Sequence, residues 1–307
     1  MKAVRFDDYG PVTVLDVRDV PVPEPGQGQV LVRVRAAGIN PGEAKIREGE
    51  LRDRWPSTFP SGQGSDFAGV VDKLGPGVTT ITPGDEVIGW VDTRSSQAQY
   101  VVADAENLAR KPAHLPWEVA GAIPVAGFTA WAMVRAVDLK PGDTVVVTGA
   151  AGGVGSIAVQ LAKRKGATVI GLAGPSNHDW LVRHDVVPVV YGDGVADRIR
   201  DAVANAGVDA FLDTHGGDYV ELALNDLKVS PERVDTIARF DAAAKYGVKV
   251  DGNAAGASAA TLGELAELAA AKDIEIPLAQ TFPLAEVRAA YAQLAKGHVR
   301  GKIVLIP

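Results

Sequence analysis

The sequence predicts an α/β fold in two parts, a β-rich part first and a doubly wound, mostly parallel sheet after it. From the first residue to about residue 115, short β-branched runs are broken by Gly and Pro, which is typical of an all-β barrel or sandwich. Beyond that point, apolar strands alternate with helices of roughly ten to fifteen residues, so the connections cross over and the strands run parallel. A chain of 307 residues has room for a core in each part.

Two segments carry the β-rich prediction. In "QVLVRVRAAG", from Gln29, Val30, Val32 and Val34 alternate with other residues as in a half-buried strand. The segment "GVVDKLGPGVTTITPGDEVIGWV" predicts a strand, a turn that contains "PGD", and a second strand.

The second part contains five apolar runs with the character of strands, which are "TVVVTG", "TVIGLAG", "VPVVYG", "VDAFLDT" and "RVDTIA". A helix is expected over 156–165 and another around Asp179. Near the end, "TLGELAELAAA" and "PLAEVRAAYAQLAKG" have apolar residues at helical spacing, and "KIVLIP" predicts a closing strand.

Composition excludes several classes of function. Apolar residues make up 47% of the chain, the net charge is -7, and no basic run is present, which disfavours nucleic acid and anionic membranes as partners. The start, "MKAVRFDDYG", lacks the apolar core of a signal peptide, and no apolar run reaches the roughly 18 residues of a membrane span. We therefore expect a cytoplasmic protein.

The absence of cysteine excludes disulfides, thiolate catalysis and cysteine-ligated metals. The five histidines show no close pair at ligand spacing, and the H-E-x-x-H pattern is absent. We expect no catalytic metal.

The turn in "TVVVTGAAGGVGSIAVQLAK" predicts an anion site, because Gly149, Gly152 and Gly155 lie between a buried strand and an amphipathic helix. The match to G-x-G-x-x-G is imperfect, since its first glycine falls on Ala150, and glycines also end strands and pack helices. A nucleoside triphosphate loop requires Gly-Lys-Ser or Gly-Lys-Thr, which is absent after Gly155. The strand and helix context favours a dinucleotide.

The end of the next strand favours NADP over NAD. An NAD site usually has Asp or Glu there, whereas this chain has Leu172, Ala173 and Gly174. Without a carboxylate to repel a 2'-phosphate, the donors just beyond can bind one; these are Ser176, Asn177, His178 and Arg183, which also suit helix capping or an ordinary surface.

The same turn also fits T-G-x-x-x-G-x-G, the pattern of short-chain dehydrogenases. That family requires Tyr-x-x-x-Lys, and none of the six tyrosines has lysine four residues on; Tyr246 has Lys249 at three. We set that family aside.

Five segments, in order, resemble the zinc-free quinone oxidoreductase branch of the medium-chain dehydrogenase/reductase superfamily. They are "RAAGINPGEAKIREG", "GSDFAGVV", "IPVAGFTAWAMV", "VDAFLDTHGGD" and "GHVRGKIVL". The resemblance implies a GroES-like β-barrel catalytic domain over 1–118 and 273–307, around a Rossmann NADP-binding domain over 119–272. It also implies a homodimer.

The resemblance further implies the site residues. Asn40, Glu43 and Thr129 are the expected catalytic residues, with Asn40 and Thr129 near the nicotinamide. By resemblance, Gly152, Gly153 and Val154 hold the diphosphate, and Ser176, Asn177, His178 and Tyr191 surround the adenosine phosphate. The further expected contacts of NADPH are Gly149, Ala151, Gly155, Arg183, His215 and Gly216, where His215 also fits an ordinary surface turn.

Zinc-dependent members of the superfamily place Cys where this chain has Asn40, and Gly-His-Glu where it has Gly64, Ser65 and Asp66. Those members also carry a cysteine-rich lobe for a structural zinc, which this chain lacks, so both zinc sites are expected to be absent. The chain also departs from its own branch: Lys45 stands where an aromatic residue is common, and 239–258 is shortened, so the shape of the substrate pocket is left open.

Without a metal, the easiest hydride acceptors are quinones and carbonyl-conjugated alkenes, which are already electrophilic. We expect hydride transfer from NADPH to a quinone, with the protein mainly orienting the reactants. Two alternatives stay open: reduction of enones or 2-alkenals by the same residues, and NADPH binding without turnover in a sensor or structural protein.

Overall fold

The computed structural model describes residues 1–204 and 207–307, which form two compact units. The first unit contains Met1–Val125 and Ala257–Pro307, and the second contains Ala126–Gly256. The domain boundaries that the resemblance implies, near residues 118 and 272, stay a prediction; the two compact units divide after residues 125 and 256.

The first unit is rich in strands, as its β-branched runs predict. Its strands are β1 (Lys2–Phe6), β2 (Asp16–Asp19), β3 (Gln29–Ile39), β4 (Ser61–Gly62), β5 (Asp66–Leu74), β6 (Glu86–Trp90), β7 (Tyr100–Asp104), β8 (Leu108–Arg110), β14 (Leu278–Pro283) and β15 (Lys302–Ile306). Its helices are α1 (Pro41–Arg47), α2 (Trp117–Ala120), α10 (Ala259–Ala270) and α11 (Val287–Ala295).

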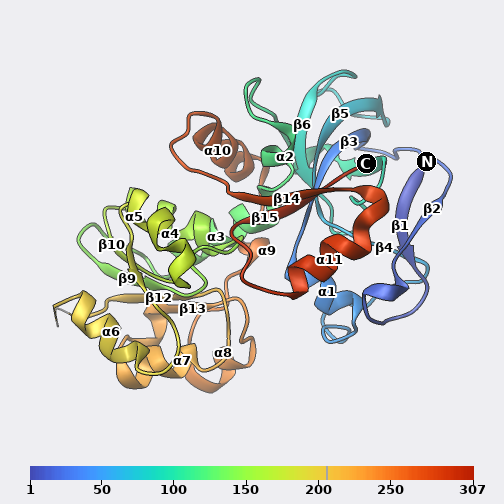
Figure 1. Ribbon diagram of the computed structural model, residues 1–307. Helices are drawn as coiled ribbons and strands as arrows, with labels where there is room; N and C mark the ends of the chain where they lie inside the picture. Colours follow the sequence, from blue (N-terminus) through green and yellow to red (C-terminus); the bar gives the residue numbers. More distant parts are fainter. Residues whose placement is uncertain (205–206) are drawn as a thin grey trace. The chain divides into compact units, whose positions relative to one another are not determined.

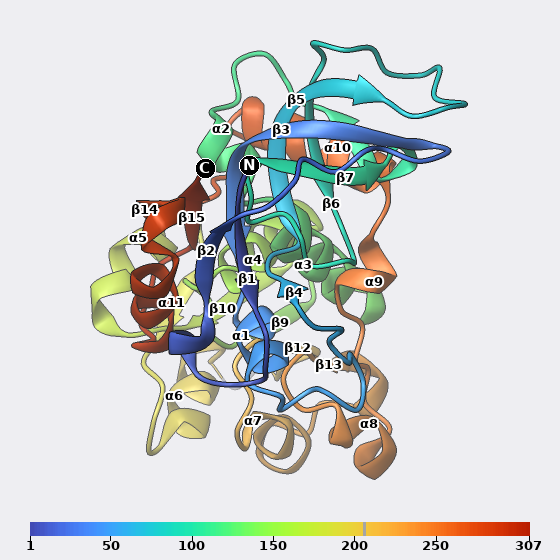
Figure 2. The same ribbon diagram turned by 90° about the vertical axis from the view of Figure 1, so that its right-hand side faces the viewer.

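The larger sheet of this unit has the order β14-β15-β3-β5-β6-β8, and β7 also pairs with β3. The long strands β3 and β5 run antiparallel side by side (Figure 2). Valines 30, 32 and 34 of β3 are buried in one apolar cluster, as their alternation predicts. The closing strand β15 pairs antiparallel with β3, with Ile303 opposite Ile39, so the C-terminal segment completes the sheet that contains β3.

The C-terminal helix α11 packs on a second apolar cluster of the first unit. This cluster contains Phe6 of β1, Ile39 of β3, Tyr291 of α11 and Leu305 of β15. Because Tyr291 contributes its ring to the core, its hydroxyl group is held at a fixed place among the strands.

The second unit alternates strands and helices. Helix α3 (Pro124–Ala136) begins in the last two residues of the first unit's initial segment. The elements that follow are β9 (Thr144–Val147), α4 (Gly155–Arg164), β10 (Thr168–Leu172), α5 (His178–Arg183), β11 (Val187–Val189), α6 (Val195–Ala202), β12 (Ala210–Asp213), α7 (Tyr219–Glu221), β13 (Val234–Thr236), α8 (Asp241–Tyr246) and α9 (Asn253–Gly256).

The five strands of this unit are all parallel, in the order β11-β10-β9-β12-β13. Numbered along the chain the order is 3-2-1-4-5, which is the Rossmann order. The direction of winding therefore reverses between β9 and β12, and ligands bind at the carboxyl ends of the strands at such a switch point.

Helices cover both faces of the parallel sheet (Figure 1). An apolar cluster joins α6 and α7 to one face through Ile199, Val220 and strand residues such as Phe211. On the other face, Leu181 of α5 lies against Gly171 of β10. The predicted doubly wound parallel sheet and the strand-rich first unit are confirmed, and the closure of the GroES-like β-barrel stays a prediction.

None of the helices in the described ranges is long and apolar enough to cross a bilayer.

Asp235, in the middle of β13, is an exception to the apolar interior of the second unit. Its side chain is fully buried, and within the described residues neither carboxyl oxygen has a hydrogen bond of good geometry, although the main-chain amide of Asp251 lies near it. Burial, together with the Asp251 carboxylate, raises its pKa from the ordinary value of 3.8 to about 8. At neutral pH the folded chain therefore holds a proton here that the unfolded chain releases.

We expect Asp235→Asn to remove a pH dependence of stability. Between about pH 4 and pH 8 only the folded state carries this proton, so stability falls as pH rises, and the loss is complete above about pH 8. The difference in unfolding free energy between pH 5 and pH 8 should shrink by roughly 2–4 kcal/mol, because each pH unit in the window contributes about 1.4 kcal/mol. Urea unfolding at the two pH values measures it. Exposed Asp226→Asn is the control, and an unchanged difference in Asp235→Asn contradicts the assignment.

Candidate functional site

The glycine turn lies at the switch point of the second unit, directly after β9. Gly149 has φ +56°, and a Cβ atom on Gly155 would lie only 2.2 Å from the carbonyl oxygen of Gly149. Gly155 thus allows α4 to begin close against the end of β9. The amides at a helix start lack intrahelical acceptors, so this turn can bind a phosphate group.

The segment "VDAFLDTHGGD", which the sequence analysis singles out, is bonded to the glycine turn through Asp213 at the end of β12. The Asp213 carboxylate accepts hydrogen bonds from the Thr148 hydroxyl group at 2.8 Å and from the amides of His215 and Gly216 at 3.0 and 2.9 Å. The Thr214 hydroxyl group donates to the carbonyl of Thr148 at 2.6 Å. The structure therefore brings the His215–Gly216 turn beside the glycine turn, on adjacent strands.

The predicted adenosine-side residues gather at the ends of β10 and β11. A Cβ atom on Gly174 would lie 3.4 Å from the Tyr191 hydroxyl oxygen, the amide of Asn177 donates to the Gly174 carbonyl, and a ring nitrogen of His178 lies 3.3 Å from the Ala173 carbonyl. Ser176 belongs to the short helical turn Pro175–Asn177 between them. Arg183 stands apart at the far end of α5.

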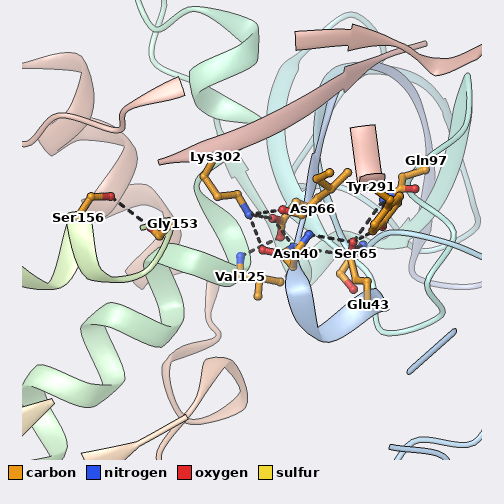
Figure 3. Close-up of polar contacts among 11 residues, drawn as sticks. Asn40, Glu43, Ser65, Asp66, Gln97, Val125, Gly153, Ser156, Tyr291 and Lys302 are labelled. Atoms are coloured by element: carbon orange, nitrogen blue, oxygen red, sulfur yellow. Dashed lines mark hydrogen bonds and ion pairs between the residues drawn. The ribbon is translucent and has the colours of Figure 1, made fainter. Parts of the chain in front are cut away.

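In the first unit, Asn40 and Glu43 belong to one buried polar cluster (Figure 3). Asn40 lies between β3 and α1 as the N-cap of the helix, and its main-chain amide donates to Glu43 Oε2 at 3.1 Å, a contact typical of a capping box. Its side-chain Nδ2 donates to Glu43 Oε1 at 3.1 Å and to Asp66 Oδ2 at 2.9 Å. Both side-chain hydrogens of Asn40 are thus used by carboxylates.

Lys302, from β15, brings a positive charge into the same cluster. Its ammonium group donates to Asn40 Oδ1, to the Ile39 carbonyl at 3.1 Å and to Asp66 Oδ2 at 3.2 Å. Asp66 Oδ1 in turn accepts from the main-chain amide of Val125 at 2.8 Å. Lys302 is 4% exposed and Asp66 is fully buried, so the pair is shielded from water.

Glu43 is held from its other side by Tyr291. The Tyr291 hydroxyl group donates to Glu43 Oε2 at 2.7 Å and accepts from the side-chain amides of Gln97 and Gln63 at 2.7 and 3.0 Å. The amide of Ser65 donates to Glu43 Oε1 at 3.0 Å. With so many donors around it, Glu43 accepts as a carboxylate.

Burial raises the pKa of the Glu43 carboxyl, and the nearby Asp66 carboxylate raises it further, whereas the hydrogen bonds from Tyr291 and Asn40 lower it. Burial, and then the Glu43 carboxylate, raises the pKa of the Tyr291 hydroxyl well above 10. Tyr291 therefore keeps its proton and remains a donor to Glu43.

The remaining predicted residues lie elsewhere. Thr129 is buried in α3 and belongs to the second unit, so its predicted partnership with Asn40 stays a prediction. Ala151, Gly152, Gly153 and Val154 form the glycine turn itself, and the Ser156 hydroxyl group lies 3.4 Å from the Gly153 carbonyl.

The polar cluster does not fit a zinc ion. Within residues 1–204 and 207–307, no group of three or more His, Cys, Asp or Glu side chains could hold a metal. Around Asn40 the available groups are an amide, two carboxylates and the ammonium group of Lys302, which repels a cation.

Sequence reasoning missed Lys302, Tyr291, Gln63 and Gln97, and considered Asp66 only as a replaced zinc-site position. One signal was available: Lys302 is a charged residue next to the apolar run "IVLIP", and a lysine there must find partners. Which partners it finds depends on strand pairing across more than two hundred residues.

The chain matches two family descriptions. Residues 26–113 match the alcohol dehydrogenase GroES-like domain, and residues 184–305 match the family described as zinc-binding dehydrogenase.

Several individual proteins are similar over most of the chain. A human quinone oxidoreductase is 30% identical over 259 residues, which cover 78% of each chain. An NADPH-dependent alkenal/one oxidoreductase from Arabidopsis thaliana chloroplasts is 30% identical over 317 residues, with 100% of this chain and 80% of the relative covered. The structure of a quinone oxidoreductase from Coxiella burnetii is 31% identical, with a TM-score of 0.88 and coverage of 100% and 99%.

We expect Gly155→Ala to lower stability by about 1–3 kcal/mol, because the added methyl group overlaps the Gly149 carbonyl and overpacking has a cost of this size. Gly252→Ala is the matched control, since Gly252 lies in the same unit and a Cβ atom there meets no atom within 4 Å. Urea unfolding compares the two. Equal midpoints for both variants contradict a packing role for Gly155.

Proposed function

Because the chain belongs to the medium-chain dehydrogenase/reductase superfamily, among its quinone oxidoreductases, we propose that it transfers hydride from NADPH to a quinone. The family descriptions and the relatives confirm the resemblance that the five segments of the sequence indicate. That the chain is an oxidoreductase with a nicotinamide cofactor follows from the family. The choice of NADPH and of quinone is the proposal.

The choice of NADPH rests on the residues at the end of β10. This strand ends in Leu172, and Ala173 and Gly174 follow, so no carboxylate stands where NAD enzymes bind the ribose 2'-hydroxyl. The hydroxyl group of Tyr191 lies beside Gly174, and the side chains of Ser176, Asn177 and His178 follow just beyond. Such donors suit a 2'-phosphate.

The glycine turn after β9 supports a diphosphate at the switch point. The pairing of Asp213 with the amides of His215 and Gly216 makes the neighbouring turn rigid, so both walls of this end of the sheet are preorganised. In this proposal Gly149, Gly152, Gly153, Val154 and Gly155 line the diphosphate.

NADPH, when bound, supplies a hydride from C4 of its nicotinamide ring. In the proposal, Asn40, Glu43 and Thr129 fix the geometry of the reaction, and the protein contributes mainly by orientation. The hydride adds its electron pair and its hydrogen to the quinone, which gives a hydroquinone anion, and one proton from solvent completes the hydroquinone. Because the proton comes from solvent, no side chain of the protein has to act as a proton donor in this reaction.

A second candidate is reduction of the carbon–carbon double bond of enals or enones. The similarity to an alkenal/one oxidoreductase, which extends over the whole of this chain, favours it. The same residues would serve, since both acceptors take a hydride at a carbon or oxygen conjugated to a carbonyl group.

The cytoplasmic location and the homodimer are also proposals, taken from the sequence and the resemblance respectively. Light scattering of the purified chain tests the dimer.

A single assay separates the candidates. The decrease in NADPH absorbance is followed with quinones, 2-alkenals and simple alcohols, each with and without a chelator. We expect fastest turnover with quinones and no effect of chelator, because the cluster around Asn40 holds an ammonium group in place of a metal. Faster reduction of 2-alkenals identifies the second candidate. NADPH binding without turnover on any acceptor identifies a sensor or structural protein, and turnover that chelator abolishes contradicts the proposal.

We expect Gly174→Asp to shift the cofactor preference from NADPH toward NADH by at least about tenfold in kcat/KM, which corresponds to about 1.4 kcal/mol. The backbone accommodates a side chain, because the added Cβ would make only an ordinary contact with Tyr191. The new carboxylate repels a 2'-phosphate and binds a 2'-hydroxyl. The matched control is Gly174→Asn, which has the same shape without the charge. An equal effect of both substitutions, or no effect, argues against a 2'-phosphate at this place.

A further inference from the structure

The side-chain amide of Asn40 has only one orientation that its neighbours tolerate. Lys302 can only donate, so it requires the amide oxygen, whereas the carboxylates of Glu43 and Asp66 can only accept, so they require the NH₂ group. A flipped amide would place NH₂ against an ammonium group and oxygen against two carboxylates. In a buried site each of these clashes is poorly screened.

We propose that Lys302 is a positioning residue for Asn40, and that its ammonium group is the fixed positive charge that sets the direction of the Asn40 amide. The inference rests on the proposed function in one respect, which is that Asn40 lies at the site of hydride transfer. Figure 3 shows Lys302 reaching from β15 to Asn40 and Asp66.

The position of this charge is itself fixed by the backbone. Lys302 precedes Ile303, which pairs with Ile39 of β3, so the ammonium group lies beside the Ile39 carbonyl at the residue before Asn40. All three hydrogens of the ammonium group have acceptors, which leaves it no freedom to turn toward another ligand.

Asp66 balances the charge of Lys302 and is brought close by a glycine. A Cβ atom on Gly38 would lie 2.8 Å from Asp66 Oδ2, so only glycine in β3 leaves space for this carboxylate. Asp66 therefore also helps to orient Asn40, because it accepts a hydrogen bond from Lys302 and another from the side-chain amide of Asn40.

One chemical consequence concerns the reduced acceptor. Both amide hydrogens of Asn40 already bind carboxylates, so Asn40 has no donor left for an oxygen that becomes negative during hydride transfer. That charge has to be met by another donor or by solvent. Asn40 contributes as a rigid, oriented group.

The test removes the charge of Lys302 without leaving Asp66 unpaired. Lys302→Met alone buries an uncompensated carboxylate and can prevent folding. The double variant Lys302→Met/Asp66→Asn removes both charges together and keeps an oxygen for the Val125 amide. Because it also replaces the acceptor of one Asn40 hydrogen, Asp66→Asn alone is measured beside it, and only the effect beyond that single change is assigned to Lys302. The matched control is Lys111→Met/Glu86→Gln. Lys111 is another buried lysine of the same unit, with a carboxylate at 2.9 Å and two carbonyl acceptors at 3.0 Å.

The first measurement is exchange of the Asn40 side-chain hydrogens with solvent, in protein labelled with ¹⁵N at asparagine. The signals that disappear in Asn40→Ala identify this amide. We expect exchange to become at least about tenfold faster in the Lys302→Met/Asp66→Asn variant than in Asp66→Asn, and to stay unchanged in the Lys111 control, because only loss of the Lys302 charge frees the amide beyond the lost Asp66 acceptor. Equal protection in the double variant and in Asp66→Asn overturns the proposal.

The second measurement is a double-mutant cycle on kcat/KM. We expect the Lys302→Met/Asp66→Asn change to lower kcat/KM by about tenfold or more when Asn40 is present, and to have no further effect in Asn40→Ala, because it acts through Asn40. The Lys111 control should have the same effect in both backgrounds. Effects of the Lys302 change that simply multiply with that of Asn40→Ala overturn the proposal.

The two measurements separate this inference from the proposed function. The exchange experiment uses the protein without nucleotide or quinone, so it decides whether Lys302 fixes the amide even if another acceptor is the substrate. If exchange accelerates but NADPH dissociation constants and kcat/KM do not respond, the amide is oriented for stability alone, and the positioning role is overturned.

Discussion

The arrangement of the polar cluster in the first unit depends on one constraint, which is that the buried charge of Lys302 must be balanced by a carboxylate and satisfied by hydrogen bonds. Lys302 is almost fully shielded from water, and a charge in that state is stable only when its hydrogen bonds are all satisfied by oxygens, one of them a carboxylate. Satisfying it requires the end of β3, the start of β5 and the closing strand β15 to meet at one place. The pairing of β15 with β3 provides that meeting, and the polar cluster is its consequence.

The surroundings of Glu43 follow from the same rule, that a buried charge needs hydrogen-bond partners. Glu43 is buried beside the Asp66 carboxylate, so it needs donors of its own, and it takes them from Asn40, Ser65 and Tyr291. Tyr291 can supply its hydroxyl group because its ring is anchored in the apolar cluster with Phe6 and Leu305. The result is a set of side chains whose orientations are mutually determined, as preorganised sites require.

The sequence predicts the glycine turn of the second unit better than the polar cluster around Asn40 in the first unit, and the reason is physical. The glycine turn combines local signals, because strand, turn and helix are adjacent in the chain and Gly155 is needed for their close packing. Helix 156–165 was expected and α4 spans Gly155–Arg164. The parallel order could also be inferred, since alternating strands and helices leave few other arrangements.

The contacts of Asn40 could not be predicted in the same way. Its neighbour Glu43 lies three residues on, within reach of a capping box, and the resemblance named it. Lys302 and Tyr291, in contrast, reach the site only through the register of β15 and the packing of α11, which no local pattern encodes. A buried carboxylate such as Asp235, without hydrogen bonds of good geometry within the described ranges, is equally invisible in the sequence, because only the fold determines that it lacks water.

The most direct test of the account is a crystal structure of the protein with NADPH at a resolution that distinguishes the side-chain nitrogen and oxygen of Asn40. The account predicts the diphosphate against the turn at Gly152–Gly155, the 2'-phosphate beside Tyr191, and Lys302 within hydrogen-bond distance of Asn40 and Asp66. A nucleotide bound elsewhere with the turn empty, or a metal ion beside Asn40 in place of the Lys302 ammonium group, would contradict it.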